Sequence, residues 1–231
     1  METYEIIQAC EGVRVIREKD MVNAFLIEGE KQALLVDSGF GGGDIAALVR
    51  SLTDKPVMLA NTHADPDHTG GNRQFDAVFL HPSEYTHYRS RPEQREDRLL
   101  SLREGDRLDL GGLTAEVILT PGHTPGSIAF LLKERRLLLS GDSVAERPIF
   151  MFGERRSIEA YIDSMERLRQ RAGEFDTIWP SHGGEPLKPE ILDRLIVAAQ
   201  LLQGGQLEPI DPPMEIPAKL YTHNGVSFFY E

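Results

Sequence analysis

Seven histidine and aspartate residues in this sequence have the types and the spacing of metal ligands. They are His63, Asp65, Asp67, His68, His123, Asp142 and His182. The first four fall within one stretch of six residues, separated by two residues from the apolar segment 57–60, and the other three end apolar segments or lie in turns rich in glycine and proline. Imidazole and carboxylate groups bind divalent transition metals, and a loop that leaves a strand can bring them together without a helix. The spacing therefore predicts a metal centre.

A centre with this many ligands can activate water for hydrolysis. A bound metal ion lowers the pKa of its water towards ~7, and a second ion about 3.5–4 Å away can share the resulting hydroxide as a bridge. Two ions need roughly six or seven protein ligands if each ion keeps an open position. The seven candidates meet that requirement. They favour a dinuclear centre that hydrolyses an ester, thioester, amide or phosphoester.

The order of these residues is similar to that of a known family. His-x-Asp-x-Asp-His at 63–68, followed by a histidine, an aspartate and a histidine, resembles the metallo-β-lactamase superfamily, whose first motif is His-x-His-x-Asp-His. The resemblance runs from about Val13 to Gly184. It implies an α/β fold, the four-layered αββα sandwich, with the metal site between the two sheets along one edge. Sequence pattern alone would leave a doubly wound α/β fold open.

The resemblance also assigns the residues to two metal ions. It implies two sets of three ligands and one shared ligand: His63, Asp65 and His123 for the first ion, Asp67, His68 and His182 for the second, and Asp142 as the bridge. A carboxylate suits the bridging position because it has two oxygens, where an imidazole has one free lone pair. Asp67 is also placed to accept a hydrogen bond from the bridging hydroxide or to pass a proton to the leaving group.

Asp65 is the one departure from the family pattern, because it stands where the family usually has its second histidine. A carboxylate is a harder ligand than imidazole and adds a negative charge. With two divalent ions, three carboxylates and one hydroxide the centre is formally neutral, whereas histidine at position 65 would leave one positive charge. We expect two divalent ions, zinc first, with iron or manganese as alternatives that Asp65 favours. A further alternative is that Asp65 binds no metal and the first site is weak or empty.

Other residues near the candidate ligands have possible supporting roles. Asp37 resembles the family's aspartate that orients a ligand histidine, although an Asx turn with Ser38 is an equal alternative. Thr62 and Ser143 border ligands and can bond carboxylates. Three histidines match no ligand position and are expected on the surface or in the core: His81, His87 and His223. Aromatic residues are expected either to line a substrate pocket or to fill the core, namely Tyr85, Tyr88 and the segment 150–152.

The rest of the chain predicts strands first and helices between and after them. We expect strands at 13–16, 23–27, 33–36, 57–60, 77–80, 108–110, 113–119, 128–132, 137–139 and 177–179. Helices are expected after Asp44, from 158 to 168 and from 191 to 202, with a terminal hairpin at 219–229. Segment 86–104 is either a lid or a solvated connection. We expect one domain over 1–231, with the last helix and hairpin, from about 186, as an extension.

Composition excludes several classes of function. The formal charge of −12 over 231 residues opposes nucleic-acid binding, since phosphates need a positive field. The densest basic clusters are Arg155-Arg156 and the triplet Arg167, Arg169 and Arg171, and the triplet is expected on a solvated helix face. The longest apolar run, 128–132, is too short to cross a membrane. No secretory signal is visible and Cys10 is the one cysteine, so we expect a cytoplasmic protein without disulfides.

These observations predict a dinuclear metal-dependent hydrolase of the metallo-β-lactamase superfamily. Its expected partner is a small ester, thioester or lactone substrate, attacked by a metal-bridging hydroxide. The segment 120–126 resembles glyoxalase II, but the short region after His182 makes glutathione specificity doubtful. A diiron oxidoreductase site related to flavodiiron proteins and a phosphodiester hydrolase are the alternatives. The oligomeric state stays open, with a homodimer as one candidate.

Overall fold

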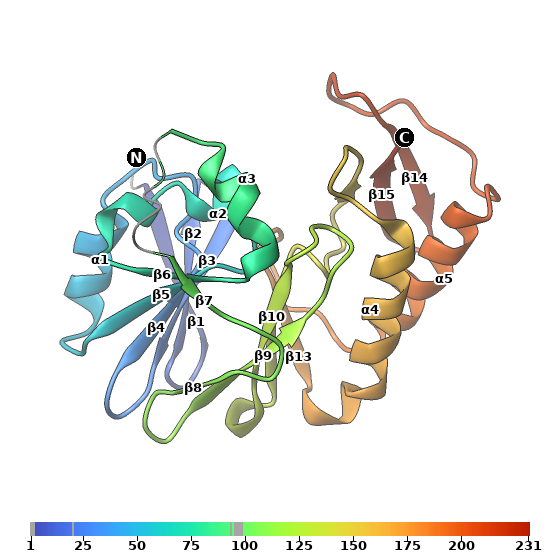
Figure 1. Ribbon diagram of the computed structural model, residues 1–231. Coiled ribbons are helices and arrows are strands. Elements are labelled where there is room, and N and C mark those ends of the chain that lie inside the picture. Colours follow the sequence, from blue (N-terminus) through green and yellow to red (C-terminus); the bar gives the residue numbers. More distant parts are fainter. Residues whose placement is uncertain (1–2, 20, 93, 95–98) are drawn as a thin grey trace.

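The computed structural model describes residues 3–231 except 20, 93 and 95–98 (Figure 1). The strands are β1 (Tyr4–Cys10), β2 (Val13–Glu18), β3 (Val22–Glu28), β4 (Ala33–Val36), β5 (Val57–Ala60), β6 (Val78–Leu80), β7 (Leu99–Ser101), β8 (Arg107–Asp109), β9 (Thr114–Leu119), β10 (Ile128–Leu132), β11 (Leu137–Gly141), β12 (Ile149–Met151), β13 (Thr177–Pro180), β14 (Lys219–His223) and β15 (Val226–Tyr230). The α-helices are α1 (Ile45–Leu52), α2 (Pro66–Thr69), α3 (Tyr85–Arg89), α4 (Ile158–Gln170) and α5 (Ile191–Gln203).

Two sheets face each other in the middle of the molecule, and helices cover their outer faces (Figure 1). One sheet has seven strands in the order β1-β2-β3-β4-β5-β6-β7, and the other has five in the order β13-β11-β10-β9-β8. α1 lies outside the first sheet, while α4 and α5 lie outside the second (Figure 1). The expected αββα sandwich is therefore confirmed.

Strands buried on both faces explain the continuous apolar runs in the sequence. In β10 all five residues are buried. Ile128, Phe130 and Leu132 belong to the cluster between the sheets, which also contains residues of β2, β3 and β4. Ala129 and Leu131 alternate with them and belong to the cluster that includes α4 and α5. The period of two in a strand thus supplies side chains to two cores at once.

The helices begin where capping side chains predict. Asp44 Oδ1 accepts a hydrogen bond from Ala47 N at 2.7 Å, and Ser157 Oγ accepts one from Ala160 N at 3.2 Å, so α1 and α4 start as expected. α5 ends at Gly204, which also confirms the predicted end of that helix. α4 and α5 pack side by side over the five-stranded sheet (Figure 1).

A third sheet of three strands joins the end of the chain to its middle. Its order is β12-β15-β14, in which β12 runs parallel to β15 and β14 pairs antiparallel with β15. Val226 and Phe228 of β15 share a buried cluster with Ile191 of α5 and Ile118 of β9. The predicted terminal hairpin is therefore packed into the core beside the five-stranded sheet.

Some sequence expectations need correction or lie outside the described residues. β1 and β12 form strands that the sequence pattern did not predict. In the segment 86–104, α3 covers the beginning and β7 joins the first sheet beside β6, whereas 93 and 95–98 lie outside the described residues. Among the residues that the structure describes, no helix combines the length and the apolar character needed to cross a membrane.

Candidate metal centre

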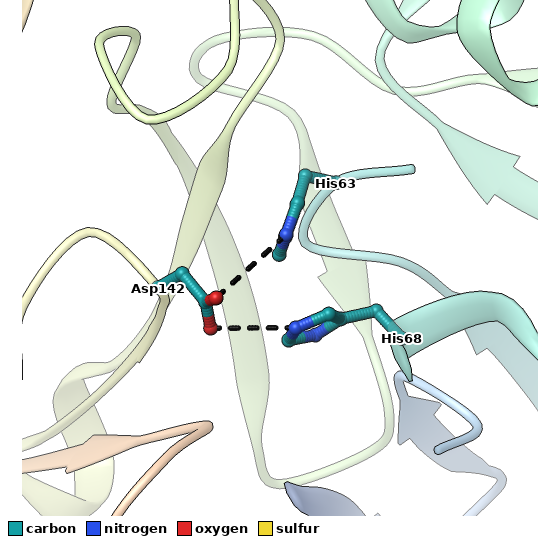
Figure 2. A group of neighbouring side chains, drawn as sticks. All are labelled: His63, His68 and Asp142. Carbon is teal, nitrogen blue, oxygen red and sulfur yellow. Dashed lines mark ion pairs between the residues drawn. The ribbon is translucent and has the colours of Figure 1, made fainter. Parts of the chain in front are cut away.

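The seven predicted ligands come from four loops at one edge of the two sheets. The loop after β5, which includes α2, carries the first four of them. The loops after β9, β11 and β13 carry the other three, His123, Asp142 and His182. β5 belongs to the seven-stranded sheet and the other strands belong to the five-stranded sheet, so the site lies between them. Figure 2 shows His63 and His68 facing the two carboxylate oxygens of Asp142 from the opposite side.

Potential ligand atoms gather in three groups, and within each group they lie within 4.8 Å of one another. The groups are His63, Asp65 and His123; Asp67, His68 and His182; and His63, His68 and Asp142. The first two groups are the two triads that the family resemblance implies. The third places Asp142 between them. All seven residues are thus brought together, as a dinuclear centre requires.

Each of the four imidazoles is held by a hydrogen bond at Nδ1. The partners are Thr62 Oγ1 for His63 (3.0 Å), Asp37 Oδ2 for His68 (2.9 Å), the Phe150 carbonyl for His123 (2.9 Å) and the Met21 carbonyl for His182 (2.7 Å). A carbonyl only accepts, so His123 and His182 donate from Nδ1. Thr62 donates its own hydroxyl proton to Asp37 and therefore accepts from His63. In the neutral form of each ring, Nε2 is left with its lone pair facing the site.

Several of these inward-facing atoms are buried without any hydrogen-bond partner. They are His63 Nε2, His68 Nε2, His123 Nε2 and Asp142 Oδ1. Leaving a buried polar atom unpaired costs about 1–3 kcal/mol, and four such atoms at one place call for a further group that satisfies them all. Nitrogen lone pairs and a carboxylate oxygen that converge in this way fit divalent metal ions.

Asp142 occupies the middle of the cluster, as a bridging ligand would. Its Oδ1 lies 3.4 Å from His68 Nε2, and its Oδ2 lies 3.3 Å from His182 Nε2 and 3.6 Å from His123 Nε2. Burial opposes the charged form of Asp142, but His182 and His68 outweigh that effect and hold the pKa of its carboxyl well below the usual range. The carboxylate is therefore ionised at neutral pH, with Oδ2 near histidines of both triads and Oδ1 near His68 of the second triad.

Carboxylates around the second triad raise the pKa of both of its histidines. Burial alone would lower the pKa of His182, but the carboxylates of Asp142 and Asp67 outweigh it and raise that pKa to about 10. The same two carboxylates, against the same effect of burial, raise the pKa of His68 well above its usual value. A site that draws protons onto its imidazoles in this way offers the same attraction to a metal cation.

Asp37 is fully buried and orients His68 of the second triad through a hydrogen bond to Nδ1. Besides His68 Nδ1, its carboxylate accepts hydrogen bonds from Thr62 N and from Thr62 Oγ1, each at 2.8 Å. Its φ of 61° is in the left-handed region that aspartate tolerates better than most residues. The expected contacts of Asp37 with a histidine and of Thr62 with a carboxylate are therefore present. Ser143 differs from expectation, because its hydroxyl pairs with Thr120 Oγ1 at 2.8 Å.

Asp65 has neighbours that sequence reasoning missed. Its Oδ2 lies 3.6 Å from His63 Nε2 and 3.4 Å from His123 Nε2, and it accepts a hydrogen bond from Arg156 Nη2 at 2.6 Å. Its Oδ1 lies 3.4 Å from Nε2 of His87, so His87 stands beside the site and not at a remote surface.

Sequence reasoning also missed the role of Glu84, a buried carboxylate that links the ligand loops after β5 and β9. Glu84 is fully buried and accepts hydrogen bonds from Ala64 N at 3.0 Å, Gly126 N at 2.9 Å and Arg155 Nη2 at 2.8 Å. Burial opposes its charge, but Arg155 outweighs that effect and lowers the pKa of the Glu84 carboxyl. The side chains of Arg155 and Arg156 thus point inward, towards two acidic side chains in the segments that follow β6 and β5.

A cavity of about 450 Å³ opens onto the centre. Its floor includes Asp65, Asp67, His123, Asp142 and His182, and its walls include Met21, Phe40, Ala145, Arg147, Pro148, Ile149, Phe150, Arg156, Pro213, Met214 and Phe229. The alternative that Phe150 lines a pocket is thereby confirmed. Tyr88 instead packs against Ala64 and Leu80 in a small buried cluster, and Met151 is buried in the core.

Comparison with known proteins agrees with this geometry. A family model described as the metallo-beta-lactamase superfamily matches residues 17–202. Acyl-coenzyme A thioesterase MBLAC2 of Homo sapiens is 26% identical and aligns with 79% of this chain and 82% of that protein. Hydroxyacylglutathione hydrolase of Gloeobacter violaceus is 33% identical, over 68% of this chain and 62% of that protein. A metallo-beta-lactamase from Pontibacter korlensis superposes with a TM-score of 0.71 at 19% identity, over 85% of this chain and 99% of that one. The chain therefore belongs to the metallo-beta-lactamase superfamily.

Proposed function

We propose that this protein is a dinuclear metallohydrolase that cleaves small acyl thioesters. The observation that carries the proposal is the set of buried, unpaired Nε2 atoms and the Asp142 oxygen, next to a largely apolar cavity that His123 and Asp142 line. Two relatives named as thioester hydrolases, acyl-coenzyme A thioesterase MBLAC2 and hydroxyacylglutathione hydrolase, support the thioester as substrate. Ester and lactone substrates use the same chemistry and come second.

The metal ions would be held by the two triads and the shared aspartate. His63, Asp65 and His123 would bind the first ion, Asp67, His68 and His182 the second, and Asp142 both. When bound, the ions supply a nucleophilic water at neutral pH and polarise the thioester carbonyl. We propose zinc, because four of the seven ligand residues are histidines, with iron or manganese as the alternatives that carboxylates favour.

Asp67 is the residue that we assign to proton transfer. Its carboxylate lines the cavity, with Oδ2 3.2 Å from His182 Nε2 and 3.6 Å from His68 Nε2. Burial opposes its charge, but His68 and His182 outweigh that effect and lower the pKa of the Asp67 carboxyl. An ionised Asp67 can take the proton from water as the water oxygen bonds to the carbonyl carbon. It can then return the proton to the sulfur as the carbon–sulfur bond breaks.

The cavity walls favour an apolar acyl group. Four large apolar side chains at the cavity remain exposed by 37% or more of their surface: Met21, Phe40, Phe150 and Met214. A volume of about 450 Å³ falls within the range of small-molecule sites. Exposed apolar walls above a polar floor can remove an acyl chain from water while its carbonyl reaches the ligands.

The proposal is tested by thiol release from acyl thioesters with protein that holds a measured two equivalents of zinc. We expect turnover that disappears on chelation and returns with zinc. Asp67→Asn should lower kcat by roughly 10²–10⁴-fold. Zinc-loaded protein that releases no thiol above the uncatalysed rate, across short and medium acyl chains, would refute the proposal.

A second candidate is a diiron oxidoreductase centre, and Asp65 is the observation that favours it. Elemental analysis of protein purified without added metal separates the two candidates. Two equivalents of iron and a visible charge-transfer band would support the second candidate, while two equivalents of zinc would support the hydrolase.

We also propose that residues 1–231 act as one domain in the cytoplasm. The extension from about 186 shares the buried cluster of α4, which supports a single unit. The single cysteine, Cys10, is free, as is usual in a reducing compartment.

A further inference from the structure

Asp65 replaces the second histidine of the family motif, and in space it is paired with an arginine. Asp65 Oδ2 is the oxygen that faces His63 and His123, and the same oxygen accepts the 2.6 Å hydrogen bond from Arg156 Nη2. Both side chains are only 15% exposed. The other oxygen, Oδ1, faces His87 at 3.4 Å. Oδ2 therefore has a hydrogen-bond partner besides the ligand histidines, whereas Oδ1 lies close to His87 without a hydrogen bond.

The backbone around Arg156 is fixed on both sides of the residue. Arg155 pairs with the buried Glu84 at 2.8 Å. Ser157 donates its N–H to the Gly122 carbonyl at 2.9 Å and caps α4. Arg156 itself donates its N–H to the Gly153 carbonyl at 3.1 Å. These contacts present the guanidinium to Asp65 from a defined position, which a mobile surface arginine would lack.

From these contacts we propose that Asp65 and Arg156 act together as one neutral, singly bonding metal ligand that takes the place of the family's second histidine. An imidazole is neutral and offers one lone pair. A free carboxylate is negative and offers two oxygens. Arg156 supplies the missing positive charge and occupies one side of Oδ2, so that the remaining lone pair faces His63 and His123.

This pairing has a consequence for the choice of metal. Zinc in proteins prefers four ligands in a tetrahedron, which suits a carboxylate bound through one oxygen. Manganese prefers more oxygen ligands, which suits a carboxylate bound through both oxygens. Arg156 is therefore a positioning residue that keeps the first site selective for zinc despite Asp65. The inference rests on the proposed metal centre.

The test compares zinc and manganese affinities of apoprotein in a double-mutant cycle. The four proteins are wild type, Arg156→Met, Asp65→His and Asp65→His/Arg156→Met. Zinc is measured by competition with a chromophoric chelator, and manganese by the electron paramagnetic resonance of the free ion. Both ions carry the same charge, so the ratio of their affinities cancels the general effect of removing a cation and retains the effect on ligand geometry.

We expect Arg156→Met to reduce the zinc-over-manganese ratio at least tenfold when residue 65 is aspartate, and less than twofold when it is histidine. Arg147→Met is the matched control, since Arg147 is an exposed arginine on the same cavity wall and should leave the ratio unchanged. Arg156→Lys keeps the charge but not the planar fork and should fall between wild type and Arg156→Met. If Arg156→Met does not fold, Arg156→Gln is judged by the same criterion.

Equal changes in the two backgrounds, or no change in either, would overturn the inference. A wild-type protein that takes up neither metal would instead overturn the proposed metal centre. The two failures are therefore distinguishable in the same experiment.

Discussion

Asp37→Asn is the substitution that probes most directly how the second triad is held. Asparagine has nearly the same shape as aspartate and also tolerates the left-handed φ of 61° found here. The backbone should therefore stay in place. What changes is the hydrogen bonding, because asparagine has one acceptor oxygen where Asp37 has two, and three donor groups point at this carboxylate within 2.9 Å.

The magnitude follows from which bonds the amide can keep. If Oδ1 stays on Thr62 N, the new NH₂ group faces Thr62 Oγ1 and His68 Nδ1, which both donate in the wild type. His68 can restore its bond only by moving its proton to Nε2, the atom that faces the second site. Replacing the carboxylate partner of a ligand histidine lowers metal affinity by roughly 10–100-fold, or about 1.4–2.7 kcal/mol. Two poorly satisfied buried donors cost a further ~2–6 kcal/mol of folding stability.

The assay is a zinc titration of apoprotein by chelator competition, with urea unfolding in parallel. We expect one equivalent to bind roughly 10–100-fold more weakly, while the other keeps an affinity close to that of wild type. Ser38→Ala is the control, since Ser38 belongs to the same buried network, where its hydroxyl donates to Asn72 Oδ1 at 2.7 Å, but it does not touch an imidazole. It should lower stability without weakening zinc. Folded Asp37→Asn protein that binds both equivalents as tightly as wild type would refute the orienting role.

Three further predictions concern the bridge, the core and the response to pH. Asp142→Ala should lose both zinc equivalents and His182→Ala mainly one, as measured by elemental analysis, and equal retention in both variants would contradict the bridging role. Tyr161→Phe removes the 2.9 Å hydrogen bond from a fully buried hydroxyl to a backbone carbonyl. It should cost ~1 kcal/mol and lower the Tm by about 2–4 °C in calorimetry, and an unchanged Tm would be inconsistent with that bond. Hydrogen bonds from Arg171 are the main cause that lowers the pKa of the partly exposed Glu174 to about 2. The resulting stabilisation is present above the unfolded pKa of about 4.5 and is lost as the pH falls towards about 2. Glu174→Gln should therefore cost no more than ~1 kcal/mol at pH 7 and progressively less below pH 4, as measured by urea unfolding. A cost that does not change with pH would rule out this linkage.

The fold was predictable wherever a segment carries its own pattern. β4 and β10 are continuous apolar runs, and their burial on both faces is what such runs indicate. β12 carries no such pattern, because it has three residues and its partner strand, β15, lies far away in the sequence. β1 is an edge strand whose residues are partly exposed, so its apolar alternation is weak. β12 therefore depends on pairing with a distant segment, whereas β1 pairs with the adjacent β2 and was missed because its own pattern is weak.

The residues of the site also fall into those that the sequence predicts and those that it does not. The ligands of the first motif are readable because four of them fall within six residues, and the order of the remaining three matches the family pattern. The partners of Asp65 were not readable, because Arg156 is 91 residues away in the sequence. The pair of Arg155 with Glu84 spans 71 residues. Two adjacent arginines in an acidic protein give no sign that each will face its own carboxylate, and only the folded chain reveals it.

The position of Arg156 links metal choice to substrate binding. The imidazoles of His123 and His182 are oriented by backbone carbonyls, which side-chain substitutions leave in place. Asp65 is oriented by a side chain on the segment between β12 and α4, and that same side chain forms part of the cavity wall. A change in this segment that alters the cavity can therefore also alter the ligand at position 65. In a family member with histidine at that position the two properties can vary independently, whereas in this chain they are coupled through one guanidinium.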